Sequence, residues 1–189
     1  MHMQIRSSEL RYGAVAQLFH WVIVAMIVAQ YALASEADRM PMGIHKLATL
    51  ARHKSIGMTV FALAVLRLLW RWSSPTPRLP PDMSAWERRG AHFSHFVLYA
   101  VLLLQPLSGL LMSSAKNYSV SWFGLFTFPN LVAPDEGLFE FFKTVHEVLA
   151  SILFFVALLH ILAALKHHFW NKDDVLRRML PMRLRGKIG

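Results

Sequence analysis

The chain has 189 residues, no cysteine and a formal net charge of +9 at pH 7, and 55% of its residues are hydrophobic. The lack of cysteine excludes a disulfide framework, an iron–sulfur cluster and thiolate-bound haem or zinc. The positive charge lies almost entirely outside four long apolar segments. The membrane therefore accounts for it, and no nucleic-acid partner is expected.

Each of the four apolar segments is long enough to cross a bilayer, because a membrane-spanning helix needs about 20 residues. The predicted spans cover residues 14–34, 53–72, 93–113 and 145–165. The second connection contains four prolines and cannot continue a helix. The third connection, 114–144, is rich in Trp and Phe and is expected to lie in the membrane interface. The sequence therefore predicts an all-α transmembrane four-helix bundle, with residues 1–189 forming one domain that contacts membrane lipids.

The distribution of Lys and Arg predicts the orientation. Of the 20 Lys and Arg residues, 14 belong to the N-terminus, the second connection, the C-terminal tail and the span ends beside them. By the positive-inside rule, both termini of this multi-pass protein are cytoplasmic, and the first and third connections face the bacterial periplasm. An alternative is that the first span is a signal peptide cleaved within Ala32–Ala37. The apolar run is longer than the usual 7–15 residues, however, and contains His20.

Four histidines lie within or at the start of the spans, where a polar ring is costly to bury. His146 and His160 are 14 residues apart, so both rings project from nearly the same face of the fourth span, about 21 Å apart along its axis. His20 lies at the depth of His160, and His53 at the depth of His146. The topology thus predicts the pairs His20–His160 and His53–His146. Two imidazoles per site can fill both axial positions of a haem iron, which suits electron transfer.

Other readings of these histidines remain open. A single histidine in a span can simply hydrogen-bond a carbonyl group of a neighbouring helix. A zinc or di-iron site is a weaker alternative, since there is neither cysteine nor a local carboxylate–histidine cluster.

Two further residues are candidates for cofactor binding. Arg67 lies about a turn from the cytoplasmic end of the second span, where it can pair with a haem propionate or extend to the lipid headgroups. His95 can line a quinone or propionate site, or be an ordinary interfacial histidine. A small basic cluster, Lys46, Arg52 and Lys54, can steer an anionic electron donor towards the outer pair or anchor the helix to lipid.

The chain from Arg11 to Pro181 resembles the bacterial di-haem cytochrome b561 family of the inner membrane. The resemblance rests on several short pieces in combination, none of which is specific alone. These pieces are Phe19-His-Trp21, His53-Lys-Ser-Ile-Gly57, Val65-Leu-Arg-Leu-Leu-Trp-Arg71 with Ser74-Pro-Thr-Pro77, His95 with Leu98-Tyr99, the Gly109 region, Trp122-Phe-Gly124, His146-Glu147, His160, Ala164-Leu-Lys-His-His-Phe169 and Lys172-Asp-Asp174.

The resemblance implies two non-covalent b haems, with His20 and His160 holding the cytoplasmic-side haem and His53 and His146 the periplasmic-side haem. It also implies electron exchange with membrane quinone, ubiquinone being the expected type. At least some family members are proposed to oxidise superoxide, which would make the chain an oxidoreductase. The donor is therefore expected to be a small anion or a redox partner protein.

Two other functions stay open. Membrane cytochrome b subunits of hydrogenases and formate dehydrogenases have a related four-helix arrangement. This suggests that the chain is an anchor in a larger redox complex, with a basic tail at 166–189 that recruits the partner. A small-solute transporter with histidine relays is disfavoured by the chain's small size, by the lack of a repeat and by the scarcity of Asp and Glu within the spans.

Overall fold

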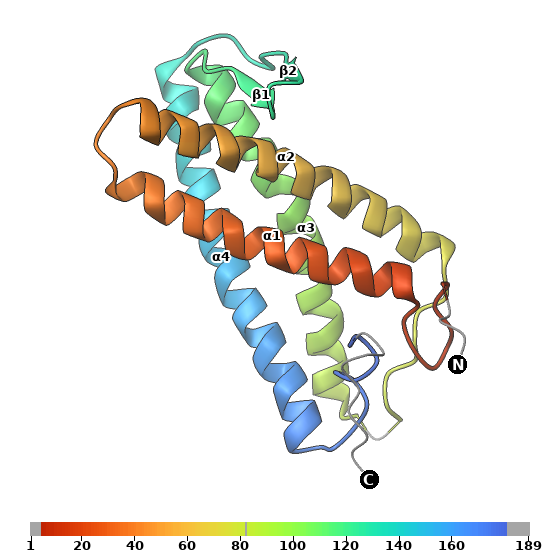
Figure 1. Cartoon of the computed structure of the whole chain (residues 1–189). Coiled ribbons are helices and arrows are strands. Elements are labelled where there is room, and N and C mark those ends of the chain that lie inside the picture. Colours follow the sequence, from red (N-terminus) through yellow and green to blue (C-terminus); the bar gives the residue numbers. More distant parts are fainter. Residues whose placement is uncertain (1–4, 82, 181–189) are drawn as a thin grey trace. The chain divides into compact units, whose positions relative to one another are not determined.

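Four long helices and one short hairpin make up the regular structure in a computed structural model, which describes residues 5–81 and 83–180. The elements are α1 (Ala14–Arg39), α2 (Ile44–Ser73), α3 (Ala85–Ala115), β1 (Val120–Trp122), β2 (Phe126–Phe128) and α4 (Glu136–Phe169) (Figure 1). All four helices are long and apolar enough to cross a membrane. The all-α class and the four membrane-length helices are confirmed. The single domain over 1–189 stays a prediction, and residues 181–189 of the basic tail lie outside the described residues.

The helices extend beyond the apolar segments that predicted them. Ser84 and Glu87 form a capping box, in which the Glu87 carboxylate accepts hydrogen bonds from the backbone N–H and hydroxyl of Ser84, and α3 therefore starts eight residues before the predicted span. Asp135 caps α4 in a similar way, accepting a hydrogen bond from the N–H of Leu138 at 2.8 Å. Both capping residues can be read in the sequence, but the apolar length alone does not reveal them.

The helices contribute to two compact units. The first unit comprises Met1–Val22, Leu66–Tyr99 and Phe154–Gly189, and the second comprises Ile23–Val65 and Ala100–Leu153. Each helix therefore supplies one part to each unit. One predicted histidine pair, His20 with His160, belongs to the first unit, and the other, His53 with His146, belongs to the second.

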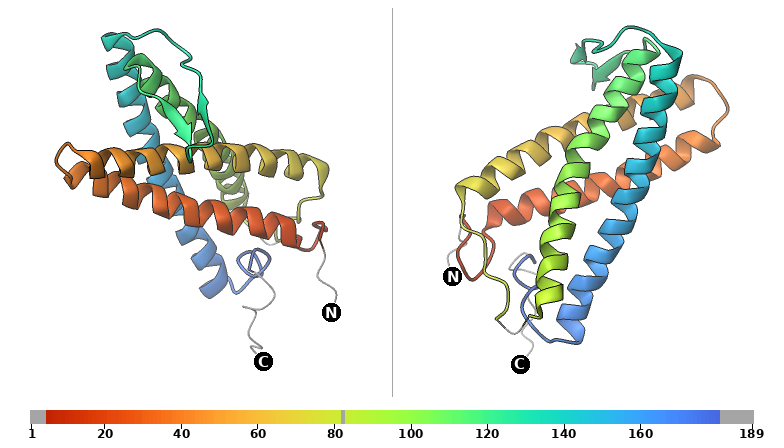
Figure 2. Two further views of the ribbon diagram at one scale, coloured as in Figure 1. Left: turned by 45° about the horizontal axis from the view of Figure 1, so that its top comes forward. Right: turned by 180° about the vertical axis from the view of Figure 1, so that it is seen from behind.

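The second unit has an apolar core between α1, α2 and α3. Ile23, Val60, Ala64 and Leu102 are buried there and pack together. In this unit α1 lies beside α2, as the left view of Figure 2 shows, and α3 lies beside α4, as the right view shows.

The hairpin is an addition that the sequence analysis did not predict. It lies within the third connection, pairs Val120 with Phe128 in antiparallel register, and turns through Phe123 and Gly124, both with positive φ. Side chains of α2 hold it in place. The Ser55 hydroxyl accepts a hydrogen bond from the N–H of Phe123 at 3.1 Å, and the indole N–H of Trp122 donates to Thr59 at 3.0 Å. The aromatic residues of this connection are thus attached to the helix that carries His53.

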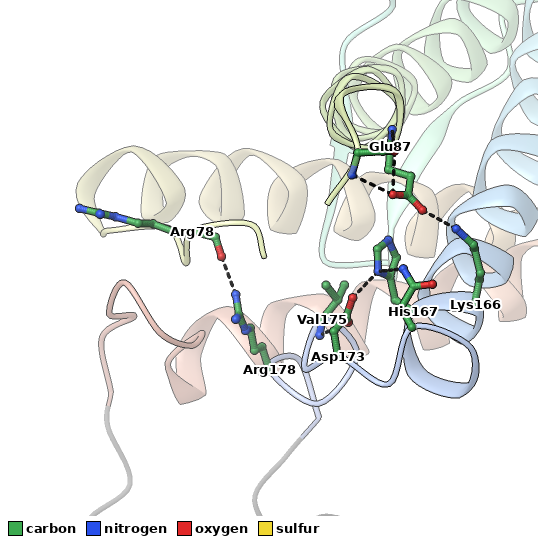
Figure 3. Close-up of polar contacts among 9 residues, drawn as sticks. Arg78, Glu87, Lys166, His167, Asp173, Val175 and Arg178 are labelled. Carbon is green, nitrogen blue, oxygen red and sulfur yellow. Dashed lines mark hydrogen bonds and ion pairs between the residues drawn. The ribbon is translucent and has the colours of Figure 1, made fainter. Parts of the chain in front are cut away.

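In the first unit, the chain that follows α4 is fixed by several polar contacts (Figure 3). His167 is buried, with 6% of its surface exposed, and its Nδ1 lies 2.5 Å from the Asp173 carboxylate, which also accepts a hydrogen bond from the N–H of Val175. This pair fixes the turn after α4, because the Asp173 N–H also donates to the His167 carbonyl. Lys166 pairs with Glu87 of α3.

The segment after this turn returns to α1. Gln17 donates a hydrogen bond to the carbonyl of Arg178 at 3.1 Å, and the Trp21 indole donates to the carbonyl of Met179 at 3.0 Å. Both side chains lie within one turn of His20, so the segment 173–180 covers the part of α1 that carries this histidine.

Candidate functional site

The second unit brings His53 of α2 and His146 of α4 together. Their ring centroids are 6.3 Å apart and the ring planes are inclined by 71°. Both residues lie more than two turns inside their helices and not at the helix ends, because α2 and α4 start earlier than the predicted spans. The backbone of each histidine is therefore fixed by regular helix both before and after it in the chain.

Hydrogen bonds from α3 define the tautomer of His146. Its Nδ1 lies 3.0 Å from the Ser108 hydroxyl and 3.1 Å from the backbone carbonyl of Gln105. The Ser108 hydroxyl donates its one proton to the same carbonyl at 2.8 Å, so it can only accept from the imidazole. Both contacts therefore require a proton on Nδ1. The lone pair of His146 is then on Nε2, which is left free to bind a metal ion.

Gly109 allows α3 to approach this ring closely. A Cβ atom at position 109 would lie 3.0 Å from Cε1 and 3.3 Å from Nδ1 of His146. The first distance is shorter than an ordinary van der Waals contact, so no side chain fits without moving the imidazole. In the structure α3 runs through Pro106 and Gly109 as one helix, and the role of Gly109 is to make room for His146.

Several buried polar atoms of the second unit have no hydrogen-bond partner. Among the described residues they include His53 Nδ1, Gln30 Oε1 and Gln105 Oε1. Gln30 contacts the same histidine through its amide nitrogen, which donates to the His53 carbonyl at 2.9 Å. Buried polar atoms are usually paired, so unpaired ones around a histidine pair are a feature to explain.

The first unit holds the second pair and a third histidine. The ring centroids of His20 and His160 are 6.4 Å apart with planes inclined by 63°, and the ring centroids of His95 and His160 are 5.4 Å apart. Both predicted pairs are thus adjacent in the structure, and His95 joins one of them. No group of three or more His, Cys, Asp or Glu residues able to hold a metal ion is found in the part of the chain that the structure describes.

Arg67 faces this histidine cluster and does not extend to the helix end. Its guanidinium donates to the Tyr99 hydroxyl at 3.2 Å and to the carbonyl of Ala16 at 3.3 Å, and it interacts electrostatically with His20 and His160. The guanidinium of Arg71 lies 5.8 Å from the Tyr99 ring centroid. Neither arginine forms an ion pair with an acidic side chain among the described residues. Two half-buried cations, one of which lies beside the pair, therefore have no carboxylate partner in the part of the chain that the structure describes.

Lys46, Arg52 and Lys54 are not joined by a hydrogen bond to one another among the described residues. Lys54 is half-buried with its ammonium 5.5 Å from the Tyr118 ring centroid, and Arg52 is exposed. The residues that sequence reasoning missed are Gln30, Gln105, Ser108 and Tyr99 as contacts of the histidines and of Arg67. No local sequence signal distinguishes them, since a polar residue in a span has many possible partners.

The fold and the site define a class of protein: a multi-pass membrane protein whose helices carry paired, largely buried imidazoles. A family model described as prokaryotic cytochrome b561 matches residues 11–182, and the chain belongs to this family. It is 34% identical over 181 residues to "Cytochrome b561 homolog 2" of Escherichia coli (strain K12), covering 94% of this chain and 95% of that protein.

Two further relatives match at similar coverage. "Cytochrome b561 homolog 1" of the same organism is 29% identical over 174 residues, covering 92% of this chain and 98% of that protein. "Probable superoxide oxidase CybB" of Yersinia pestis is 28% identical over 171 residues, covering 90% and 96%. The chain is therefore a membrane cytochrome b of the bacterial electron-transfer type, and its family binds b-type haem.

The residues present fit such a group. A metal–imidazole bond is about 2.0–2.1 Å, and a ring nitrogen lies about 1.1 Å from the ring centroid, so two imidazoles on opposite sides of one metal ion have centroids about 6.3 Å apart. The observed separations are 6.3 and 6.4 Å. The Nδ1-protonated form of His146 also leaves Nε2 free, as a ligand requires.

Proposed function

We propose that the chain binds two b-type haems, one between His53 and His146 and one between His20 and His160, and moves electrons between a periplasmic donor and membrane quinone. The observation that carries this proposal is the presence of one histidine pair in each unit, with centroid separations of 6.3 and 6.4 Å. Bound haem supplies reversible one-electron chemistry at its iron, and two histidine ligands leave no open position for oxygen.

The residues around each pair support these roles. On α3, Ser108 and the Gln105 carbonyl hold His146 in the tautomer that presents Nε2. In the first unit, Arg67 and Arg71 lack carboxylate partners among the described residues, and the two propionates of a haem have the charge to neutralise them. His95, packed against His160, would line the same pocket.

The sidedness of the proposal follows from the charge distribution. With both termini in the cytoplasm, the first unit contains the cytoplasmic ends of α1 and α4, and His20 and His160 form the cytoplasmic-side site. His53 and His146 then form the periplasmic-side site. The localisation that we propose is the inner membrane with both termini cytoplasmic.

The donor that we favour is a small anion, and superoxide is the candidate because a relative is named a probable superoxide oxidase. Superoxide releases one electron and becomes oxygen. Two such electrons and two protons convert a quinone such as ubiquinone to the quinol, so the reaction balances. Lys46, Arg52 and Lys54 precede or follow His53 on α2 and would attract an anion to this side. A redox partner protein is the alternative donor.

The test is a reduced-minus-oxidised spectrum of the purified protein in detergent, with haem measured per polypeptide. Two low-spin b haems per chain are expected. One haem per chain would show that one pair is misassigned. A folded protein with no haem would overturn the proposal and favour a transporter. Mixing the protein with superoxide and a soluble quinone, and following quinol formation, then tests the donor and acceptor.

A further inference from the structure

We infer that Ser108 of α3 is a positioning residue that sets the ring orientation and electron-donating strength of His146, and with them the reduction potential of the haem in the second unit. This inference rests on the proposed function, because it takes His146 to be a haem ligand. Ser108 lies on α3 and His146 on α4, and Ser108 would affect the haem through its hydrogen bond to the His146 ring.

The proton assignment carries the first step. The Gln105 carbonyl can only accept, so its contact with His146 Nδ1 is a hydrogen bond when that nitrogen carries the proton, and the Ser108 hydroxyl, which donates to the same carbonyl at 2.8 Å, then accepts from Nδ1 at 3.0 Å. Gln105 contributes its backbone carbonyl at 3.1 Å from the same nitrogen. The N–H of His146 is therefore shared between two acceptors on one turn of α3. Ser108 is 4% exposed, so water does not compete strongly for this hydrogen bond.

The geometry of the ring carries the second step. Gly109 lies against the Cε1–Nδ1 edge of the imidazole, and Ser108 and Gln105 are hydrogen-bonded to Nδ1, so one turn of α3 contacts this edge of the ring. Rotation of the ring about its Cβ–Cγ bond would break these hydrogen bonds. α3 therefore fixes the orientation of the His146 ring, one of the two rings that are inclined by 71°.

The chemical consequence follows from the effect of a hydrogen bond on a ligand. Acceptors at Nδ1–H increase the basicity of the imidazole and its donation to the metal, which stabilises the oxidised iron. The partner ring lacks this support, since His53 Nδ1 is buried with no hydrogen-bond partner among the described residues. Of the two proposed ligands, His146 is therefore the one whose Nδ1 is hydrogen-bonded, and Ser108 is one of the two acceptors.

The experiment compares Ser108→Ala, Ser108→Thr and Ser108→Val in the full-length protein. Thr and Val have nearly the same shape, so any cost of the added methyl group is shared and only the hydroxyl differs. We expect Ala and Val to shift one of the two haem potentials to a more positive value and to change one ferric low-spin electron paramagnetic resonance signal. Thr should retain the wild-type values, and so should the control Ser151→Ala, because the exposed hydroxyl of Ser151 donates to the carbonyl of Glu147 in its own helix.

Each outcome decides the inference. Loss of one haem in Ala and Val but not in Thr would also support it, because the hydroxyl then determines ligand affinity. Equal behaviour of Thr and Val, unchanged potentials and signals in Ala and Val, or a shift to more negative potentials would overturn it. His146→Ala separates the two proposals. If His146→Ala retains both haems, the proposed ligand set is wrong. If His146→Ala loses one haem but the Ser108 variants keep the wild-type potentials and signals, only the role of Ser108 is refuted.

Discussion

The ring of His146 lies so close to Gly109 that a Cβ atom on the glycine would be 3.0 Å from Cε1. We therefore expect Gly109→Ala to displace the imidazole and weaken haem binding in the second unit. Overpacking of this kind costs about 1–3 kcal/mol, equivalent to roughly a 5- to 150-fold loss of affinity. Haem content per chain and the rate of haem transfer to apomyoglobin measure this loss.

The matched control is Gly90→Ala on the same helix. A Cβ atom there would meet nothing within 4 Å, and alanine is the better helix former by about 0.8–1.0 kcal/mol. Gly90→Ala should keep both haems and melt no earlier than the wild type. Equal haem content in the two variants would show that the close contact at Gly109 has no functional consequence.

The two histidine pairs predict a pattern of paired losses. His53→Ala and His146→Ala should each remove the same haem and leave the same residual spectrum, because either change leaves an iron with one axial ligand. His20→Ala and His160→Ala should each remove the other. Haem stoichiometry and potentiometric titration distinguish the two sets. His45→Ala, an exposed residue of α2, is the control and should retain both.

Arg67 predicts an electrostatic effect confined to the first unit. Arg67→Gln removes a cation beside His20 and His160, and a nearby positive charge favours the reduced haem. The potential of the haem held by this pair should become more negative, with the other haem unchanged. Tyr99→Phe, which removes the hydroxyl that holds the guanidinium, should give a smaller shift of the same sign. A shift in the haem of the second unit instead would contradict the placement of the propionates beside Arg67.

The bond between His167 and Asp173 predicts a local stability effect. Asp173→Asn replaces a charge-assisted hydrogen bond worth about 1.5–3 kcal/mol by a neutral one worth about 0.5–1.5 kcal/mol, so the segment 173–180 should open roughly 10-fold more often. Trypsin cleavage at Arg177 or Arg178, followed by mass spectrometry, reports this opening. The neighbouring Asp174→Asn serves as the control, since the Asp174 side chain is exposed and its contact with Arg177 is 3.8 Å long. Equal cleavage rates would show that the pair does not hold the segment.

Much of the site could be predicted because a membrane constrains depth. The 14-residue spacing of His146 and His160 fixes both on one face of α4, and the order of the spans gives each a partner at the same depth. The structure brings His20 beside His160 and His53 beside His146. The capping residues Ser84 and Asp135 were also readable, although the apolar segments alone predicted later helix starts.

The sequence by itself determined the four helices, the family and the position of each histidine along its helix, since apolar length and helical periodicity are properties of local chain segments. Only the tertiary structure decided that Ser108, Gln105 and Gly109 surround His146, that Tyr99 holds Arg67, and that the Trp122 hairpin attaches to α2. The physical reason is that depth along a helix is fixed by counting residues. Rotation about its axis and the choice of neighbouring helix depend instead on packing between segments that are distant in the sequence.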